Sequence, residues 1–300
     1  MKLKFYSYKI NFSKKIHLKR GDLSFREGII IENNDTFAEI APLPYFSMDS
    51  LNQVYKFLEA NYLNIPNIWD ATFAQNLITL KLPSLNFSYY ALTHPLTASK
   101  RIIPYNFILG TTQEIVKKLN GKEGIFKIKV GIYNFDEEIN MLRKIYSQSK
   151  VKLIIDANCN LTIDQAQEIL RETANNIVYF EDPCPTIKQC LSLNTQIALD
   201  ELNRNNLINE LNPLNDVTLN SKLKKCIKII KPTISGMNEV ILANSPILTS
   251  AFESPIAIKY IEQLSYTHNL PNPGTDTLKY FNVDEINMNN FIKNLKPIHF

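Results

Sequence analysis

The sequence predicts an α/β barrel that follows a smaller α+β module. Five short apolar runs in the second half of the chain each end in a charged residue. The runs are residues 125–129, 153–156, 177–181, 197–200 and 227–231, which end at Lys129, Asp156, Glu181, Asp200 and Lys231. The intervals between these charges are 27, 25, 19 and 31 residues, and each is roughly the length of one strand–helix–strand unit. Buried parallel strands are short Ile, Val and Leu runs, and an α/β barrel opens onto its active site where such strands end.

Length and composition favour one enzyme-sized unit. The 300 residues are 45% hydrophobic and 21% charged, which is ordinary for a globular protein. The net charge of +4 comes without a basic block, so we expect no nucleic-acid partner. The four cysteines form no C-x-x-C pair, and no apolar stretch approaches the ~20 residues of a membrane span. We therefore expect a cytoplasmic protein without a membrane segment, either a monomer or a homo-oligomer.

Residues 1–95 are predicted to form the α+β module. Strand-like runs are found at residues 2–12, 29–31 and 37–40. The segment 22–27 between two of these runs is flanked by Gly21 and Gly28, which predicts a mobile turn. Residues 47–50 resemble a helix cap, and a second helix is expected at 71–78. The face of the first helix is formed by Leu51, Val54, Tyr55 and Leu58.

Residues 96–280 are predicted to form the barrel, in which strands and helices alternate from about Tyr105. Helices are expected at 112–119, 136–147 and 162–173, the last capped by Thr162, and further strands at 246–249 and 269–273. Eight or so parallel strands with right-handed connections imply a closed barrel. The segment 281–300 is expected to pack back on the module or on the barrel. Neither a P-loop nor a G-x-G-x-x-G motif is present, so a nucleotide-binding doubly wound fold is disfavoured.

Three of the strand-end charges are carboxylates, on Asp156, Glu181 and Asp200. Oxygen ligands without His or Cys suit Mg²⁺ or Mn²⁺ rather than zinc. A divalent ion there would grip a substrate carboxylate and stabilise the enediolate formed when the adjacent carbon loses its proton. One isolated carboxylate at a strand end is more often a helix cap or an ion-pair partner, but three at successive strand ends favour a metal site.

The lysines at strand ends are candidates for proton transfer. Lys127 and Lys129 are two residues apart and so project from one side of a strand. Inside a barrel the two ammonium groups are expected to lower each other's pKa, which would make a base that works near neutral pH. The alternative is an exposed edge strand with alternating lysines. Lys231 is expected to face Lys129 from across the barrel, and its alternative is a solvated loop lysine.

Several short motifs together resemble a known family. The ordered set is Lys127-Ile-Lys129, Asp156-Ala-Asn158, Glu181-Asp-Pro183, Asp200-Glu201 and Lys231-Pro-Thr233. It resembles the motif set of the enolase superfamily, and most of all its o-succinylbenzoate synthase family in menaquinone biosynthesis. Residues 38–47 resemble that family's capping-domain segment, and 230–236 and 250–254 resemble its sixth and seventh strand ends. Departures are Ala38 in place of a glycine and the absence of an aromatic residue shortly after Asn158.

The resemblance implies a (β/α)7β TIM-like barrel with an N-terminal capping domain, and a lyase. The implied reaction is the Mg²⁺-dependent syn dehydration of a small dicarboxylate, 2-succinyl-6-hydroxy-2,4-cyclohexadiene-1-carboxylate, to o-succinylbenzoate. Lys129 is implied to be the base and then the acid, Lys127 to tune and position it, and Lys231 to stabilise the enediolate by its charge. Residues implied to support the metal ligands are Asn158, Asp182 and Glu201.

The resemblance also implies which residues contact the substrate, but it narrows them only to groups of candidates. Donors to the second substrate carboxylate are expected among Ser235, Gly236, Ser250 and Ser254, with Glu253 beside them. Residues 20–28 resemble the family's flexible lid, from which Arg26 would reach the succinyl carboxylate; an ordinary surface loop is the alternative. Two other functions remain open, an N-succinylamino-acid racemase or dipeptide epimerase and a non-catalytic binding protein. The second is disfavoured because all five strand-end charges are retained.

Overall fold

The computed structural model describes residues 3–18, 21–61, 77, 79–95, 104–173, 176–204 and 217–300. The chain divides into two compact units, one formed by Met1–Pro104 with Ile230–Phe300 and the other by Tyr105–Ile229. Residues 230–300, which follow the predicted sixth strand, are thus grouped with the N-terminal module. No helix in the described ranges is long and apolar enough to cross a membrane.

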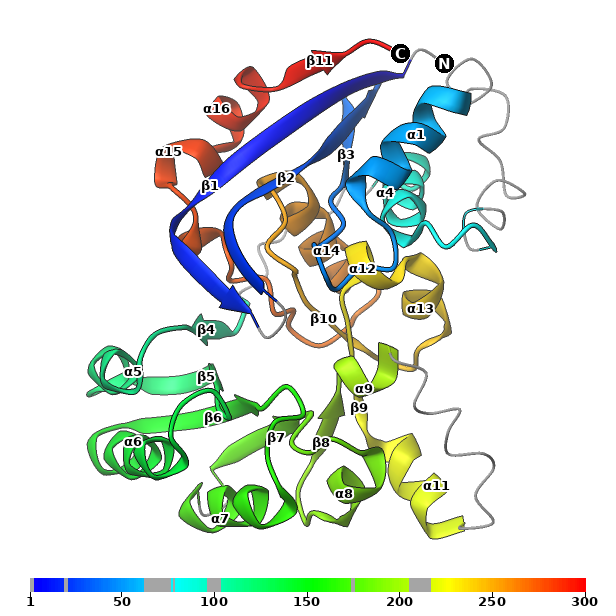
Figure 1. Ribbon diagram of the computed structural model, residues 1–300. Coiled ribbons are helices and arrows are strands. Elements are labelled where there is room, and N and C mark those ends of the chain that lie inside the picture. The colour runs from blue at the N-terminus through cyan, green and yellow to red at the C-terminus, as the bar shows by residue number, and fades with distance from the viewer. Residues whose placement is uncertain are drawn as a thin grey trace. The chain divides into compact units, whose positions relative to one another are not determined.

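The first unit is built on an antiparallel sheet with the strand order β11-β1-β2-β3 (Figure 1). Its strands are β1 (Lys4–Leu18), β2 (Gly21–Asn33), β3 (Thr36–Ile40) and β11 (Lys296–Ile298). The hairpin between β2 and β3 turns at Asn34 and Asp35, whose φ angles of 46° and 65° suit a two-residue turn of this kind. The C-terminal residues return to this sheet, because β11 pairs with β1 from Phe5↔Ile298 to Ser7↔Lys296.

The predicted mobile turn at 22–27 is wrong. These residues lie inside β2 and pair with β1, with Asp22 opposite His17 and Arg26 opposite Ile10. Gly28 is not a turn residue either. A Cβ there would lie 2.5 Å from the Ile40 carbonyl oxygen and 2.6 Å from the Tyr8 ring, so the glycine allows a close approach within the strand. Arg20 lies outside the described residues.

Several helices of the first unit share a buried apolar core with this sheet. The helices of this unit are α1 (Leu51–Asn61), α4 (Pro83–Thr93), α12 (Pro232–Ser235), α13 (Met237–Leu242), α14 (Pro255–Thr267), α15 (Val283–Ile286) and α16 (Met288–Lys293), with a 3-10 turn at Leu278–Tyr280 and the short strand β10 (Ile247–Leu248). The predicted helix after residue 50 is confirmed as α1, whose Val54 and Leu58 are buried. Most of the helix predicted at 71–78 lies outside the described ranges.

The second unit alternates parallel strands and helices, as the sequence predicts. Its strands are β4 (Asn106–Ile108), β5 (Glu123–Lys129), β6 (Lys150–Asp156), β7 (Ile177–Glu181), β8 (Ile197–Leu199) and β9 (Ile227–Ile230). Its helices are α5 (Thr112–Leu119), α6 (Phe135–Gln148), α7 (Ile163–Thr173), α8 (Ile187–Ser192), α9 (Glu201–Arg204) and α11 (Val217–Lys225). The hydrogen-bonded strand order is β10-β9-β8-β7-β6-β5-β4, a run of sequential parallel neighbours typical of an α/β barrel. The predicted fold class is confirmed.

Alternate residues of these strands face two different environments. Phe126, Ile128, Leu153, Ile155 and Phe180 belong to the buried apolar cluster that also contains residues of α5, α6, α7 and α8. Those helices lie along one side of the strands in Figure 1. The residues between, such as Lys127, Lys129 and Asp156, therefore point to the opposite face of the sheet.

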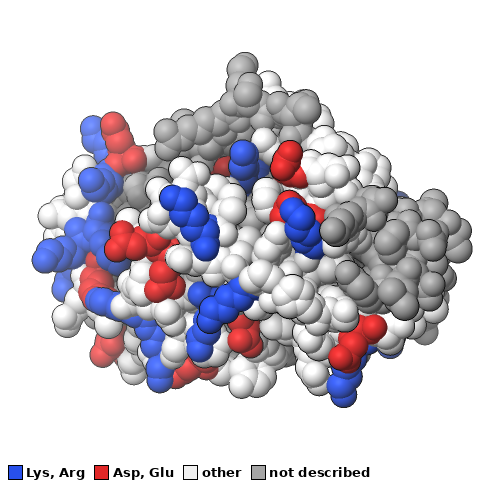
Figure 2. Space-filling view, turned by 90° about the horizontal axis from the view of Figure 1, so that it is seen from above, with Lys and Arg blue, Asp and Glu red and all other residues white. Residues whose placement is uncertain are grey.

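Charges on the surface of the described residues are mixed. On the face shown in Figure 2, basic and acidic side chains lie interspersed, without a continuous block of either sign. This agrees with the small net charge of +4.

Candidate active site

The strand register brings the site together. Lys129 at the end of β5 is the partner of Asp156 at the end of β6, and Asp156 is the partner of Glu181 at the end of β7. Neighbouring parallel strands in register put such side chains at one level and on one face. Three residues separated by dozens of positions in the sequence thus form one row.

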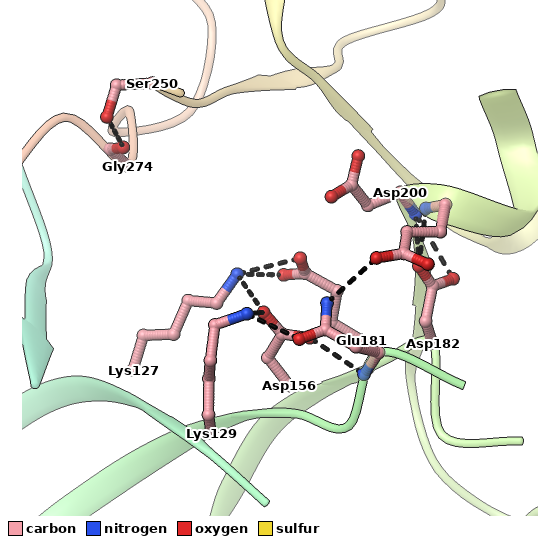
Figure 3. A network of polar contacts seen from close by, with 10 residues as sticks. Lys127, Lys129, Asp156, Glu181, Asp182, Asp200, Ser250 and Gly274 are labelled. Carbon is pink, nitrogen blue, oxygen red and sulfur yellow. Dashed lines mark hydrogen bonds and ion pairs between the residues drawn. The ribbon is translucent and has the colours of Figure 1, made fainter. Parts of the chain in front are cut away.

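Lys127 lies between two carboxylates of this row (Figure 3). Its Nζ donates to both carboxylate oxygens of Glu181 at 2.7 Å and lies 3.0 Å from Asp156 Oδ2. All three side chains are buried. Asp156 and Glu181 therefore converge on one cationic group.

The expected pKa shift of Lys127 is wrong in sign. Burial by itself lowers the pKa of Lys127, but the Asp156 and Glu181 carboxylates outweigh it and hold the pKa well above its usual value. The expectation considered only repulsion between two lysines and missed the carboxylates that the strand register brings beside them. Lys127 is consequently a fixed positive charge rather than a proton acceptor.

Lys129 is held differently. Its Nζ donates to Asn158 Oδ1 at 2.5 Å and lies 3.5 Å from Asp156 Oδ2. Its side chain is 23% exposed, whereas that of Lys127 is 10% exposed. Of the two lysines on β5, Lys129 is thus the one that a bound molecule can reach.

Asn158 is a bridge between the lysine and the acidic groups. Its backbone N–H donates to Asp156 Oδ1 at 3.1 Å, and its side-chain Nδ2 donates to Glu201 Oε1 at 3.4 Å. The left-handed φ of 45° at Asn158 belongs to the tight turn after β6, a conformation that Asn tolerates well. This turn aims the Asn158 amide back at the strand ends.

Asp182 anchors the end of β8. Its carboxylate accepts the backbone N–H groups of Asp200, at 3.2 and 3.3 Å to its two oxygens, and of Glu201 at 2.5 Å. Burial raises the pKa of Asp182 well above its usual value, and the Asp200 and Glu181 carboxylates raise it further. Asp182 thereby fixes the backbone that carries Asp200.

The donor set fits a hard divalent cation. The three predicted ligands are 3%, 0% and 2% exposed at Asp156, Glu181 and Asp200. Even without Asp182, whose pKa is raised, the four buried carboxyl groups of Asp156, Glu181, Asp200 and Glu201 accompany two lysine ammonium groups at these strand ends. Such an excess of buried negative charge calls for further positive charge. Among the described residues, no group of three or more His, Cys, Asp or Glu side chains is arranged so that it could hold a metal ion. The carboxylates would therefore have to rearrange around an ion.

One carboxylate near the site was not predicted from the sequence. Glu138 on α6 is buried and accepts the backbone N–H groups of Gly131, Ile132 and Tyr133 at 2.8 to 2.9 Å. It fixes the loop that leaves β5 directly after Lys129. A glutamate in the first turn of a predicted helix gives no sign of such a role until the loop is folded over it.

The remaining predicted site residues lie in the other compact unit. Lys231 is the residue before α12, and its carbonyl accepts the N–H groups of Ile234 and Ser235 at 2.9 Å. Gly236 follows with a φ of 79°. Ser250 shares a hydrogen bond with Thr277 at 2.8 Å and donates to the Gly274 carbonyl at 3.3 Å. The expected meeting of Lys231 with Lys129 therefore stays a prediction.

Three of the residues predicted to contact substrate are buried and have partners within the protein. The Arg26 guanidinium is 1% exposed and donates to the carbonyls of Phe252, Pro42 and Ala41 at 3.1, 3.0 and 2.8 Å. Ser254 is fully buried; its hydroxyl donates to Glu39 and caps α14 by accepting the Ile256 N–H. Glu253 is fully buried as well. All three groups are engaged inside the first unit, because burial leaves them only intramolecular partners.

Two family models match separate parts of the chain. The model described as "MenC, N-terminal domain" matches residues 1–92. The model described as "Enolase C-terminal domain-like" matches residues 114–206, the stretch that carries Lys127, Lys129, Asp156, Glu181 and Asp200. The two matches follow the division between the N-terminal module and the alternating strands and helices.

Curated relatives named o-succinylbenzoate synthase align with most of the chain. An o-succinylbenzoate synthase of Aliivibrio fischeri (strain MJ11) is 26% identical over 93% of this chain and 90% of its own length. That of Haemophilus influenzae is 25% identical over 91% of this chain and 88% of its own length. Both alignments span the two compact units of this chain.

Solved structures agree in fold. An o-succinylbenzoate synthase of Thermosynechococcus elongatus BP-1, complexed with Mg in its active site, has a TM-score of 0.68 and 19% identity over 94% of each chain. An L-Ala-D/L-Glu epimerase of Bacillus subtilis has the same TM-score at 14% identity, over 95% of this chain and 91% of its own. At such identities these likenesses establish the fold alone. The sequence relatives and the two domain matches, in contrast, make the chain similar to the o-succinylbenzoate synthases of the enolase superfamily over most of its length.

Proposed function

We propose that this protein is an o-succinylbenzoate synthase, a carbon–oxygen lyase of menaquinone biosynthesis. Its substrate would be 2-succinyl-6-hydroxy-2,4-cyclohexadiene-1-carboxylate, which loses water to become o-succinylbenzoate. The observation that carries the proposal is the row of Lys129, Asp156 and Glu181 at three adjacent strand ends. It combines a reachable lysine with buried carboxylates on one face of the sheet.

Lys129 would carry the proton. Its Nζ takes the proton from the ring carbon that bears the carboxylate, and the electron pair left behind forms a double bond as the neighbouring C–O bond breaks. Lys129 then returns the proton to the departing hydroxide, so that water leaves on the same face of the ring. The exposed part of Lys129 and its short bond to Asn158 support this role, because a general acid–base group must be both accessible and oriented.

Asp156, Glu181 and Asp200 would hold Mg²⁺, with Mn²⁺ as a substitute. When bound, the ion supplies positive charge to the substrate carboxylate as the neighbouring proton leaves. Asp182 supports this group of ligands by fixing the Asp200 backbone. Lys127 donates to both oxygens of Glu181 in the structure, so it would have to give up at least one of these bonds for Glu181 to bind the ion.

Lys231 would add a second positive charge near the ring. In the proposed reaction it takes up no proton, so its contribution is electrostatic. Ser235, Gly236 and Ser250 remain candidates for contacts to the succinyl carboxylate. The curated relatives carry the synthase name, and this favours the dehydration over racemisation of N-succinyl amino acids.

The proposal is tested by mixing the purified protein with the cyclohexadiene substrate and Mg²⁺ and following the ultraviolet loss of the diene. We expect conversion to o-succinylbenzoate that stops in excess chelator and returns with added Mg²⁺. Glu181→Gln should be inactive while its circular dichroism stays native, and Glu137→Gln on the exposed side of α6 should be active. Absence of conversion by the folded, Mg²⁺-supplied protein would refute the proposal.

A further inference from the structure

We propose that Thr233 and Glu253 are positioning residues that fix Lys231, the lysine to which the proposed function gives an electrostatic role. The inference deepens that function and rests on it for the part played by Lys231. It concerns only residues of the first compact unit.

Lys231 stands at the start of a helix that is too short to hold itself. The helix α12 has four residues, and no side chain caps its N-terminus. Helices of this length gain little from their own hydrogen bonds, so contacts from outside must hold them in place. The two N–H groups that bond to the Lys231 carbonyl come from Ile234 and Ser235 in this same turn. Whatever fixes the turn therefore fixes the Lys231 backbone.

Thr233 is a side chain of this turn with a hydrogen bond to another part of the unit. Its hydroxyl donates to Glu253 Oε1, and both side chains have no exposed surface. A hydrogen bond to a carboxylate in such a buried place is stronger than one between neutral groups. The threonine lies two residues after Lys231, so its bond acts on the turn that begins there.

Glu253 is itself fixed on the other side. Its second oxygen accepts the N–H of Ala251 at 2.6 Å, and Arg26 donates to the carbonyl of Phe252 at 3.1 Å. These bonds hold the loop after β10 in place, and the bond from Thr233 to Glu253 connects α12 to that loop. The buried Glu253 carboxylate thus has hydrogen-bond partners on both of its oxygens.

Thr233→Val removes the hydroxyl and keeps the shape of the side chain, whereas Thr233→Ser keeps the hydroxyl. Thr249→Val is a matched control, because Thr249 is also buried and its hydroxyl has no hydrogen-bond partner among the described residues. Glu253→Gln is a second variant, for use if Thr233→Val does not fold. Circular dichroism and thermal unfolding establish which variants are folded.

The kinetic test is a double-mutant cycle with Lys231→Gln. We expect Thr233→Val to lower kcat about tenfold or more with little change in KM, since small misplacements of a charged group are costly. Thr233→Ser and Thr249→Val should stay near the parent rate. In the Lys231→Gln background, Thr233→Val should change kcat by less than about twofold. An equal loss with and without Lys231 would mean that Thr233 supports the fold in general, and would overturn the inference.

A second measurement is independent of activity. Mass spectrometry after brief exposure to an amine-reactive reagent gives the labelling rate of Lys231, and hydrogen exchange gives the protection of the Ile234 and Ser235 amides. We expect Thr233→Val to change both, while Thr233→Ser and Thr249→Val leave both unchanged. Unchanged labelling and exchange in folded Thr233→Val would overturn the positioning role even in an active enzyme. A clear change in a protein without dehydratase activity would instead retain the positioning role and refute the proposed function.

Discussion

Single residues show most clearly what the folded chain adds to the sequence. Lys127 and Lys129 are two similar positions of one strand pattern, yet Lys127 lies between the carboxylates of Glu181 and Asp156, whereas Lys129 bonds to Asn158 and lies farther from Asp156. Arg26 was expected in a mobile segment, and the strand pairing of β2 buries it instead. Such differences depend on which strands become neighbours, which a local pattern does not contain.

Substitutions of Lys129 and Lys231 are predicted to lower the rate of dehydration to different extents. Lys129→Ala should lower dehydration by about 10²- to 10⁴-fold, the usual contribution of a general acid–base group. Lys231→Arg keeps a positive charge but cannot take up a proton near neutral pH, so it should retain measurable dehydration. Steady-state rates of both variants and of Lys231→Gln check this. If Lys129→Ala and Lys231→Arg are equally inactive in folded, metal-binding protein, a two-base racemase becomes the better assignment.

The titration of Glu253 should make the free energy of unfolding depend on pH. Burial raises the pKa of Glu253 above its ordinary value of 4.5, and Glu39 adds to this, although Thr233 and Arg26 act in the opposite direction. A carboxyl group with a raised pKa in the folded state stabilises the fold fully below the unfolded value and loses that stability as pH rises through the folded value. The free energy of unfolding of the parent minus that of Glu253→Gln should therefore fall as pH increases from below 4.5.

Urea unfolding of the two proteins over a pH series measures this difference. Glu137→Gln, which changes an exposed glutamate, is the control and should show no such trend relative to the parent. A difference that stays constant with pH would mean that Glu253 titrates alike in the folded and unfolded chain.

At the scale of helices and strands, the sequence was informative where apolar and charged residues alternate in a clear pattern. Every apolar run that ends in a charge is a strand in the structure, and the helices near 112, 136 and 162 are present. The helices α4 and α14 were missed. Most of the residues of both are buried, so neither shows the contrast between two faces by which a helix is recognised. The hydrogen bonds of Glu138 could not be predicted either, because they reach backbone N–H groups of a loop outside its own helix.

Glu138 gives a prediction at this scale. Glu138→Ala removes the acceptor of three backbone N–H groups in the loop after β5. Water can replace part of these bonds, so we expect a loss of about 2 kcal/mol in the free energy of unfolding. The neighbouring Glu137→Ala should stay within about 0.5 kcal/mol of the parent. Urea unfolding measures both, and equal stability of the two variants would contradict the proposed role of Glu138.

For the whole molecule, the sequence predicted the fold class and the row of strand-end charges, and the curated relatives are similar to the chain over nearly all of its length. The return of residues 281–300 was expected onto either the module or the barrel, but the sequence did not predict that residues 230–280 would group with the N-terminal module. Both placements depend on long-range packing, such as the pairing of β11 with β1. Local periodicity carries no information about contacts between chain ends.

Binding of a divalent ion should stabilise the folded protein as a whole. An ion that binds only the folded state adds about 2.7 kcal/mol at a concentration 100-fold above its Kd. The midpoint of thermal unfolding should therefore rise when Mg²⁺ is added, and it should rise less in Asp200→Asn than in the parent. Asp164→Asn, on the exposed side of α7, is the control and should respond like the parent. An identical Mg²⁺ response of Asp200→Asn and the parent would remove Asp200 from the ligands.

The central claim is that this site performs a dehydration with one base. The most direct measurement offers the purified protein both the cyclohexadiene substrate and an N-succinyl amino acid in D₂O with Mg²⁺, and compares formation of o-succinylbenzoate with deuterium exchange at the α-carbon. The account predicts a kcat/KM for dehydration well above that for exchange, with both rates lost in Lys129→Ala. Rapid exchange without formation of o-succinylbenzoate would contradict it.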